Sequence, residues 1–337
     1  MLLAREGGDW WDQLADGVAA DPVAATILRS PSTKTGPYRM TRQDVPPDLR
    51  VEVFSAAMRA LAQARGVAVA GIEPPDLSAD HFGNILLIHF AALARLRGFE
   101  SSRDIELLDA ALGHERYYWE LLLTEDPEAA AALPAFEQAL ALVTLLGGTR
   151  MAADTKSVIA ETPQCKGRPR ELHERLFALL RRLYPQEGGV SALLPDLLGE
   201  RLVARALMQD DELLDIALAR GRDQAGAKRA LTVLTRLAQR DPTQQALLTR
   251  ALDRHLADHL RQALEVGGET CEPMPATICA IVRAKPKAMA RQLIVPLLQA
   301  IPKDTTNLRG LAASIAQINV ELIKDGAKVK HGAKIRV

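Results

Sequence analysis

The clearest hydrophobic pattern lies between Asp80 and Leu123, where two helices are predicted on either side of a Gly-Phe-Glu turn. The first, at about 83–97, is apolar on nearly every side, which indicates burial inside a helical bundle. The second carries one stripe at helical spacing, formed by Ile105, Leu108, Leu112, Trp119 and Leu122. At the start of this second helix, Ser101 or Ser102 can accept a hydrogen bond from the first free backbone N–H groups. Asp104 places a negative charge in the first turn of the same helix.

Helical periodicity continues through nearly every segment after residue 48. It predicts a helix at 48–65 with Val53, Met58 and Leu61 inward, and a helix that ends at Gly147-Gly148. A short helix is predicted to end at Ala160, one helix to span 172–183 and two helices to lie within 193–220. Five more helices are predicted to start near Asp223, Asp241, Pro275, Pro286 and Asp304. The later units of roughly 18–30 residues indicate stacked helical pairs without a strict repeat.

The predicted fold is therefore all-α: a multi-helix bundle followed by an α-solenoid-like stack of helices. We expect more than about 60% helix and no sheet of three or more strands. The composition agrees, because 48% of the 337 residues are apolar but only 4% are aromatic. Leucine and alanine must then form the core, and both residues favour helices.

Cysteine usage and hydropathy bound the environment in which the chain works. Its three cysteines are few and odd in number, and no CxxC pair exists. This pattern argues against a disulfide framework or a thiolate zinc site and fits a reducing compartment. No apolar run approaches the roughly 18 residues of a membrane span. The sequence therefore predicts a cytoplasmic protein that has no membrane partner.

Charge is balanced over the whole chain, with 42 basic and 42 acidic residues, but it is unevenly distributed. Residues 283–337 hold 11 Lys or Arg against 3 Asp or Glu, which leaves 31 against 39 in the rest. The basic segment 283–337 is expected to attract an acidic partner, whereas nucleic acid is not expected. Residues 1–8 and 326–337 are expected to be mobile, because neither buries enough apolar surface to offset its ordering entropy.

Candidate chemistry is sparse. The chain contains no GxxxxGK[ST] and no GxGxxG. Gly147-Gly148-Thr149 follows a helix and lacks the lysine of a phosphate loop, so a helix C-cap is the favoured interpretation. His255 and His259, four residues apart, could share a metal ion, but the glutamate of HExxH is absent and a solvated helix face is favoured. His114–Trp119 could contact nucleotide or a neighbouring domain, although Trp119 is predicted to be a core anchor. We therefore predict no catalytic residue, no metal and no cofactor.

Several segments together resemble bacterial STAND proteins, the signal-transducing NTPases related to NACHT and plant-type resistance proteins. LLAREGGDWW at 2–11 resembles the end of their NTPase core. The other matching segments, in chain order, are GHERYYW at 113–119, ALVTLLGG at 141–148, LRRLYP at 180–185, LLPDLLGERLVARAL at 193–207 and ALTVLTRLAQRDP at 230–242. By this resemblance Arg5 would sense the nucleotide phosphate.

The resemblance implies a division into the end of an NTPase core with a loop (1–50), a helical and winged-helix-like region (51–200), a tetratricopeptide-like arm (201–325) and a basic tail (326–337). The family's Walker A and Walker B segments lie upstream of the arginine that Arg5 resembles, and this sequence contains neither. The expected function is thus a regulatory and interaction module, either a fragment or truncated product of a larger NTPase or a degenerate member that only binds. Its expected partners are its own NTPase or effector domains or other proteins. The alternative is a free-standing helical scaffold whose basic C-terminal part binds an acidic protein or nucleic acid.

Overall fold

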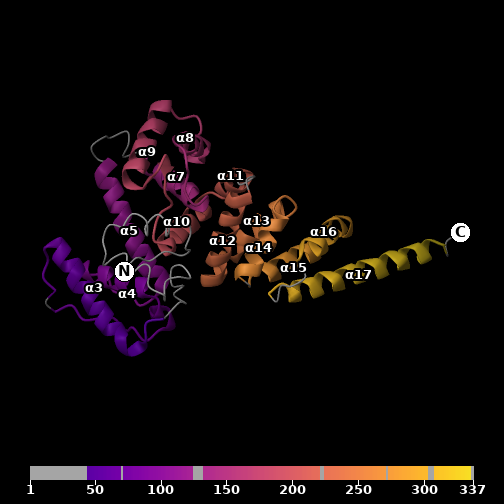
Figure 1. Cartoon of the computed structure of the whole chain (residues 1–337), viewed down its shortest axis with the longest axis horizontal. Coiled ribbons are helices and arrows are strands. Elements are labelled where there is room, and N and C mark those ends of the chain that lie inside the picture. The colour runs from indigo at the N-terminus through magenta and orange to yellow at the C-terminus, as the bar shows by residue number, and fades with distance from the viewer. Residues whose placement is uncertain are drawn as a thin grey trace, which may run out of the picture. The chain divides into compact units, whose positions relative to one another are not determined.

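The computed structural model describes residues 44–69, 71–123, 132–220, 224–270, 272–302 and 307–334, with residues 224 and 325–334 described by their backbone alone. The prediction of an all-α fold is confirmed: the fold is 76% helical, and the described part contains 14 α-helices (Figure 1). Within the same part, the single sheet is a pair of two-residue strands. Arg5, residues 1–8 and the predicted helix starts near Asp223 and Asp304 lie outside the described residues.

The chain divides into two compact units, Met1–Leu107 and Leu108–Val337. In the first unit, α3 (Arg50–Arg65) packs against α4 (Ile85–Leu96). The buried face of α3 centres on Phe54, Met58 and Ala62, so Met58 points inward as predicted. Val53 and Leu61 are only half-buried, because the stripe is rotated by one position from the one we predicted.

A buried arginine organises the loop between these two helices. The Arg50 guanidinium donates to the carbonyl oxygens of Leu77, Ser78 and Ala79 at 2.8, 3.1 and 2.9 Å. Arg50 is itself only 6% exposed. Its donors satisfy backbone acceptors that the irregular chain from residue 77 to residue 79 would otherwise leave unpaired. The short 3₁₀ turn η2 (Asp80–Gly83) and the Asn84 cap, whose side chain accepts from the Leu86 N–H, then lead into α4.

The second unit begins with a helical bundle. Its elements are the part of α5 (Asp104–Leu123) that follows Leu107, α7 (Leu133–Leu145), α8 (Ala152–Glu161), η3 (Pro163–Cys165), α9 (Arg170–Leu183), β1 (Pro185–Gln186), β2 (Gly189–Val190) and α10 (Asp196–Gln209). Helix α7 is the centre of this bundle, since Pro134 and Glu137 are the two of its residues that are not buried. An element with no solvated face must be packed on all sides. Here α8, α9, α10 and α11 (Glu212–Arg220) all contact it.

Gly147 and Gly148 close α7, as the sequence predicts. Both have positive φ, 77° and 94°. The Gly148 N–H donates to the Val143 carbonyl at 2.8 Å and the Gly147 N–H donates to the Thr144 carbonyl at 3.0 Å, which are the bonds of a Schellman-type cap. The next residue, Thr149, forms a β-bridge with Val190 at the end of the β1–β2 hairpin. The glycine pair therefore turns the chain from α7 onto the hairpin.

The rest of the second unit is a stack of helices (Figure 1). After α10 and α11 come α12 (Gln224–Arg240), η4 (Pro242–Gln244), α13 (Gln245–His255), α14 (Leu260–Thr270), α15 (Met274–Ala284), α16 (Lys287–Ala300) and α17 (Arg309–Lys334). Every helix from α10 to α15 packs against the helix two positions further along. Each unit contacting only near neighbours is the arrangement of an α-solenoid. The predicted stack is confirmed.

Three details of the stack differ from the sequence expectation. The sequence also predicts that Pro195 lies inside the first turn of a helix, whereas it lies at the N-cap of α10. Two helices, α13 and α14, occupy the stretch that we read as one. Helix α17 continues through the start of the predicted tail to Lys334. Ala327, Lys328, Lys330, Ala333 and Lys334 favour a helix in that stretch and Gly326 and Gly332 disfavour one, and the prediction of a tail gave most weight to the glycines.

Candidate functional site

The HERYYW segment of α5 contributes one side chain to the core and one to a polar cluster. Trp119 is completely buried, and its ring lies 5.3 Å from that of Phe136 on α7, measured between centroids. Its Nε1–H donates to the Tyr184 hydroxyl at 2.8 Å. A buried indole needs such an acceptor. The prediction that Trp119 is a core anchor is confirmed.

The Tyr184 hydroxyl also donates to the carboxylate of Glu115, one turn before Trp119 on α5. Burial raises the pKa of Glu115, and the hydrogen bond from Tyr184 partly offsets that effect. The pKa of Tyr184 is raised too, first by its burial and then by the nearby Glu115 charge. Glu115, Tyr184 and Trp119 thus form a hydrogen-bonded chain that ties α5 to the end of α9.

Because the pKa of Glu115 is raised, the free energy of unfolding is expected to depend on pH. A carboxyl group whose pKa is raised on folding stabilises the protein fully below its unfolded pKa, and the contribution is lost as pH rises through the folded value. We expect Glu115→Gln, which keeps an acceptor for Tyr184, to unfold at higher urea than the parent at pH 7. The difference in urea midpoint between variant and parent should vanish near pH 4, where the Glu115 carboxyl of the parent is protonated and therefore neutral, like the glutamine of the variant. A Glu115→Gln midpoint at or below the parent midpoint at pH 7 would contradict this assignment.

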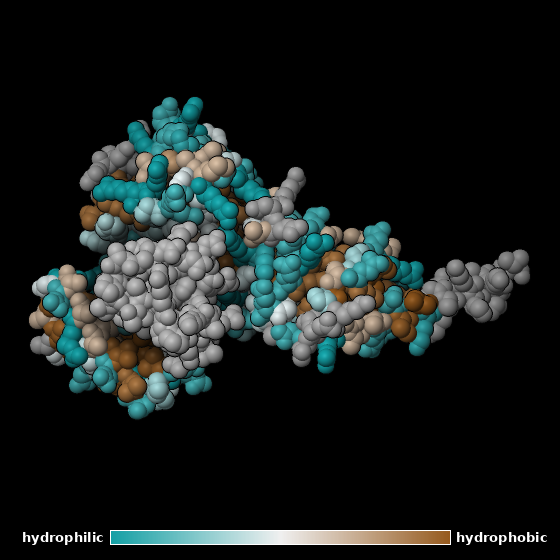
Figure 2. Space-filling model, viewed as in Figure 1, coloured by the Kyte–Doolittle hydropathy of each residue, from teal (hydrophilic) through white to brown (hydrophobic). Residues whose placement is uncertain are grey.

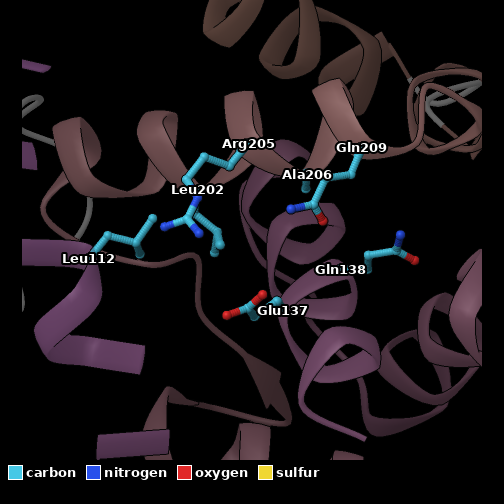
Figure 3. A pocket seen from close by; sticks show the side chains of 7 residues that line it. All are labelled: Leu112, Glu137, Gln138, Leu202, Arg205, Ala206 and Gln209. Atoms are coloured by element: carbon cyan, nitrogen blue, oxygen red, sulfur yellow. The ribbon is translucent and has the colours of Figure 1, made fainter. Parts of the chain in front are cut away.

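A small polar pocket lies between α5, α7 and α10 (Figure 3). Its lining consists of Leu112, Glu137, Gln138, Leu202, Arg205, Ala206 and Gln209. Burial raises the pKa of Glu137, while the charges of Arg116 and Arg205 act in the opposite direction. Arg116 Nε lies 3.3 Å from Glu137 Oε1. The pocket volume is about 10 Å³, which is room for about one water molecule. Side chains of opposite charge line the pocket, and it is too small for a nucleotide.

The two candidate metal ligands are directed to other partners. His255 ends α13 and its Nε2 lies 2.9 Å from Asp215 Oδ1. His259 lies in the turn before α14, with Nε2 3.1 Å from the Leu218 carbonyl oxygen. Their ring centroids are 6.3 Å apart. Across the described residues, no group of three His, Cys, Asp or Glu side chains is placed to hold a metal ion. Both histidines instead attach α13 and the following turn to α11.

The cysteines inside the described part are not activated. Cys165 is fully buried, and burial raises the pKa of its thiol to about 11. Burial also raises the pKa of Cys279. A nucleophilic thiol needs a lowered pKa, so neither residue is suited to covalent catalysis.

A ladder of ion pairs across the stack was missed by the sequence reasoning. Acidic residues on one helix pair with basic residues two helices later, 39 or 40 positions along the chain. The pairs are Asp196–Arg236, Glu200–Arg240, Asp211–Arg250 and Asp215–Arg254, at 3.4, 2.8, 2.5 and 2.7 Å. The sequence does contain a signal for this ladder, namely acids and bases that recur 39 or 40 residues apart. The ion pairs match the register of α10 on α12 and of α11 on α13.

Glu200 differs from the other acids of this ladder because its side chain is only 4% exposed. It contacts two cations, Arg236 at 3.7 Å and Arg240 at 2.8 Å. A buried carboxylate is stable only when it is paired and hydrogen-bonded. Both arginines are therefore needed at the α10–α12 contact.

Comparison of this chain with protein-family models, curated proteins and solved structures finds no match. None of the described helices combines the length and the apolar content needed to cross a membrane.

Proposed function

We propose that this chain is a regulatory and protein-interaction module of a STAND-type signal-transducing NTPase in the cytoplasm, without catalytic activity of its own. The observation that carries the proposal is the α10–α17 stack. Such stacks expose a long, continuous surface and are used to bind other proteins rather than to assemble a reaction centre. The polar cluster of Glu115, Trp119 and Tyr184 is a structural network, and the small pocket lined by Glu137 and Arg205 has room for only about one water.

The element order ahead of the stack also supports the proposal. Helix α7, the Thr149 bridge, α8, α9 and the β1–β2 hairpin follow one another in the order of a winged helix. The sequence resemblance implies such a region between the NTPase core and the helical arm. In that interpretation GHERYYW and LRRLYP, which meet at the Trp119–Tyr184 hydrogen bond, stabilise the bundle from which the arm extends.

The isolated chain is expected neither to bind ATP tightly nor to hydrolyse it. Without a P-loop there is no lysine and no set of backbone amides to neutralise a triphosphate, and no acid to hold magnesium. Titration of the purified chain with ATP and Mg²⁺ in a calorimeter should give no heat of binding at micromolar concentrations. A micromolar Kd would contradict this expectation.

The proposed function is tested by translating the DNA upstream of the codon for Met1. We expect a Walker A segment, GxxxxGK[ST], followed by a Walker B strand that ends in an acidic residue, in the same or a neighbouring reading frame. Their absence would favour the free-standing scaffold, for which the excess positive charge of residues 283–337 is the supporting observation. A scaffold that binds nucleic acid through this charge would lose affinity steeply with added salt.

A further inference from the structure

Helix α17 has apolar residues on two opposite sides. One stripe, formed by Leu311, Ile315 and Ile318 and preceded by Leu308 in the turn before the helix, is buried within the stack. The other stripe, which we call the outer stripe, consists of Ala313, Ala316, Val320 and Ile323, all exposed. Val320 is 49% exposed and Ile323 is 60% exposed. A helix that ends a stack against water normally shows a polar outer face.

Helix α16 repeats the same spacing on its own exposed side, with Ala288, Arg291, Val295 and Leu298 three, four and three residues apart. Val295 is 54% exposed. The two helices are joined at this level, because the Arg291 guanidinium donates to the Leu322 carbonyl at 2.8 Å. Figure 2 shows hydrophobic side chains over this end of the second unit. Residues at i, i+3, i+7 and i+10 are the pattern that a partner helix packs against.

The described charged side chains around these stripes are mainly basic. Arg309 and Lys324 lie at the two ends of the outer stripe of α17, and Arg291 lies within the stripe of α16; all three side chains are exposed. Over the described residues 274–302 and 307–324 there are six Lys or Arg and one acid, Glu321. Glu321 accepts from the Gln317 amide at 3.1 Å. Glu321 falls outside the outer stripe, so among the residues of 274–302 and 307–324 the exposed charges next to the stripes are those of Arg291, Arg309 and Lys324.

We infer that the exposed faces of α16 and α17 form a docking surface for an acidic amphipathic helix of a partner protein. The apolar stripes supply the buried contact, and Arg291, Arg309 and Lys324 select negative charge at its rim. The inference rests on the proposed function only in taking the chain to be a protein-interaction module, and it adds the face and the chemistry of the partner.

The test uses the full chain and a fluorescent synthetic helix of about three heptads, with leucine at the a and d positions and glutamate at the outward positions. We expect the anisotropy of this peptide to rise on titration with the chain. A peptide with the same leucines but lysine in place of glutamate, and one with the same composition shuffled to remove the stripe, should bind about tenfold more weakly or not at all.

The matched variants are Val320→Glu with Ile323→Glu, and Met208→Glu as the control. Met208 is 67% exposed on α10, away from the surface that we propose. All three positions are exposed, so each variant should keep the parent circular dichroism spectrum and melting temperature. The double variant should weaken peptide binding about tenfold, because it places acids on the stripe, and Met208→Glu should leave binding unchanged.

Several outcomes would overturn the inference: no binding of the acidic peptide, equal binding of the lysine peptide, or equal binding by the Val320/Ile323 double variant. Stripe-dependent binding to phosphatidylcholine vesicles that contain phosphatidylserine, or to a single-stranded oligonucleotide, in place of the peptide would assign the surface to another ligand. Concentration-dependent dimerisation abolished by the double variant would make the occupant a second copy of this chain. If the peptide binds but no P-loop is encoded upstream, the docking surface stands and only the proposed function fails.

Discussion

Replacing Trp119 with alanine is expected to lower the free energy of unfolding by about 3–5 kcal/mol. The substitution removes a fully buried indole that packs against Phe136, and it also removes the donor to the Tyr184 hydroxyl. Urea denaturation followed by circular dichroism measures the effect. If Trp119→Ala shifts the melting temperature by only about one or two degrees, Trp119 is not a core anchor, and a binding role for HERYYW returns.

The neighbouring residue supplies the control for Trp119. Tyr118 is on the same helix and is 47% exposed, so Tyr118→Ala should change stability by no more than about 0.5 kcal/mol. Tyr184→Phe separates the packing of the indole from its hydrogen bond. It leaves the Trp119 N–H buried without an acceptor, which should cost about 1–3 kcal/mol.

The second large effect is expected at Glu200. Removing both of its cations, in an Arg236→Ala and Arg240→Ala double variant, leaves a buried carboxylate unpaired and should cost about 3–5 kcal/mol. Adding Glu200→Met to the double variant should recover part of that loss, because the uncompensated charge is then gone. Urea unfolding at pH 7 measures both variants.

The ladder contains its own matched control for this prediction. Arg250 and Arg254 pair with Asp211 and Asp215, whose side chains are 43% and 40% exposed. Water solvates those two carboxylates when the arginines are removed, so the Arg250→Ala and Arg254→Ala double variant should cost only about 0.2–1 kcal/mol per pair. Equal losses in the two double variants would show that the burial of Glu200 does not determine the effect.

The sequence predicts the helices of this protein well because they are amphipathic and have distinct ends. The stripe through Leu108, Leu112 and Trp119 identifies α5, and the glycines after Leu146 identify the end of α7. The predicted inward face of α3 was rotated for a simple reason. Phe54 and Ala62, which are buried with Met58, each lie one position after Val53 and Leu61, and both sets fit a helical period. Periodicity identifies a helix more reliably than it identifies which of two adjacent positions faces inward.

The features that the sequence did not predict depend on contacts between distant segments. No glycine or proline separates α13 from α14, and the intervening turn is held by the bond from His259 to Leu218. The burial of Glu200 follows from the packing of α10 on α12. The cluster of Glu115, Trp119 and Tyr184 joins Tyr184 to two residues of α5, the nearer of which is 65 positions earlier in the chain. Local pattern contains no information on such pairings, although the spacing of 39 or 40 residues between acids and bases could have suggested the register of the stack.

The central proposal, a regulatory module of a STAND-type NTPase, is tested most directly by ATP turnover. The P-loop core that we expect in the same or a neighbouring reading frame is purified alone, and its hydrolysis rate is measured with increasing amounts of this chain. We expect a saturable, several-fold change in rate, and we expect no hydrolysis by the chain alone. A rate that stays constant up to a large excess of the chain would contradict it.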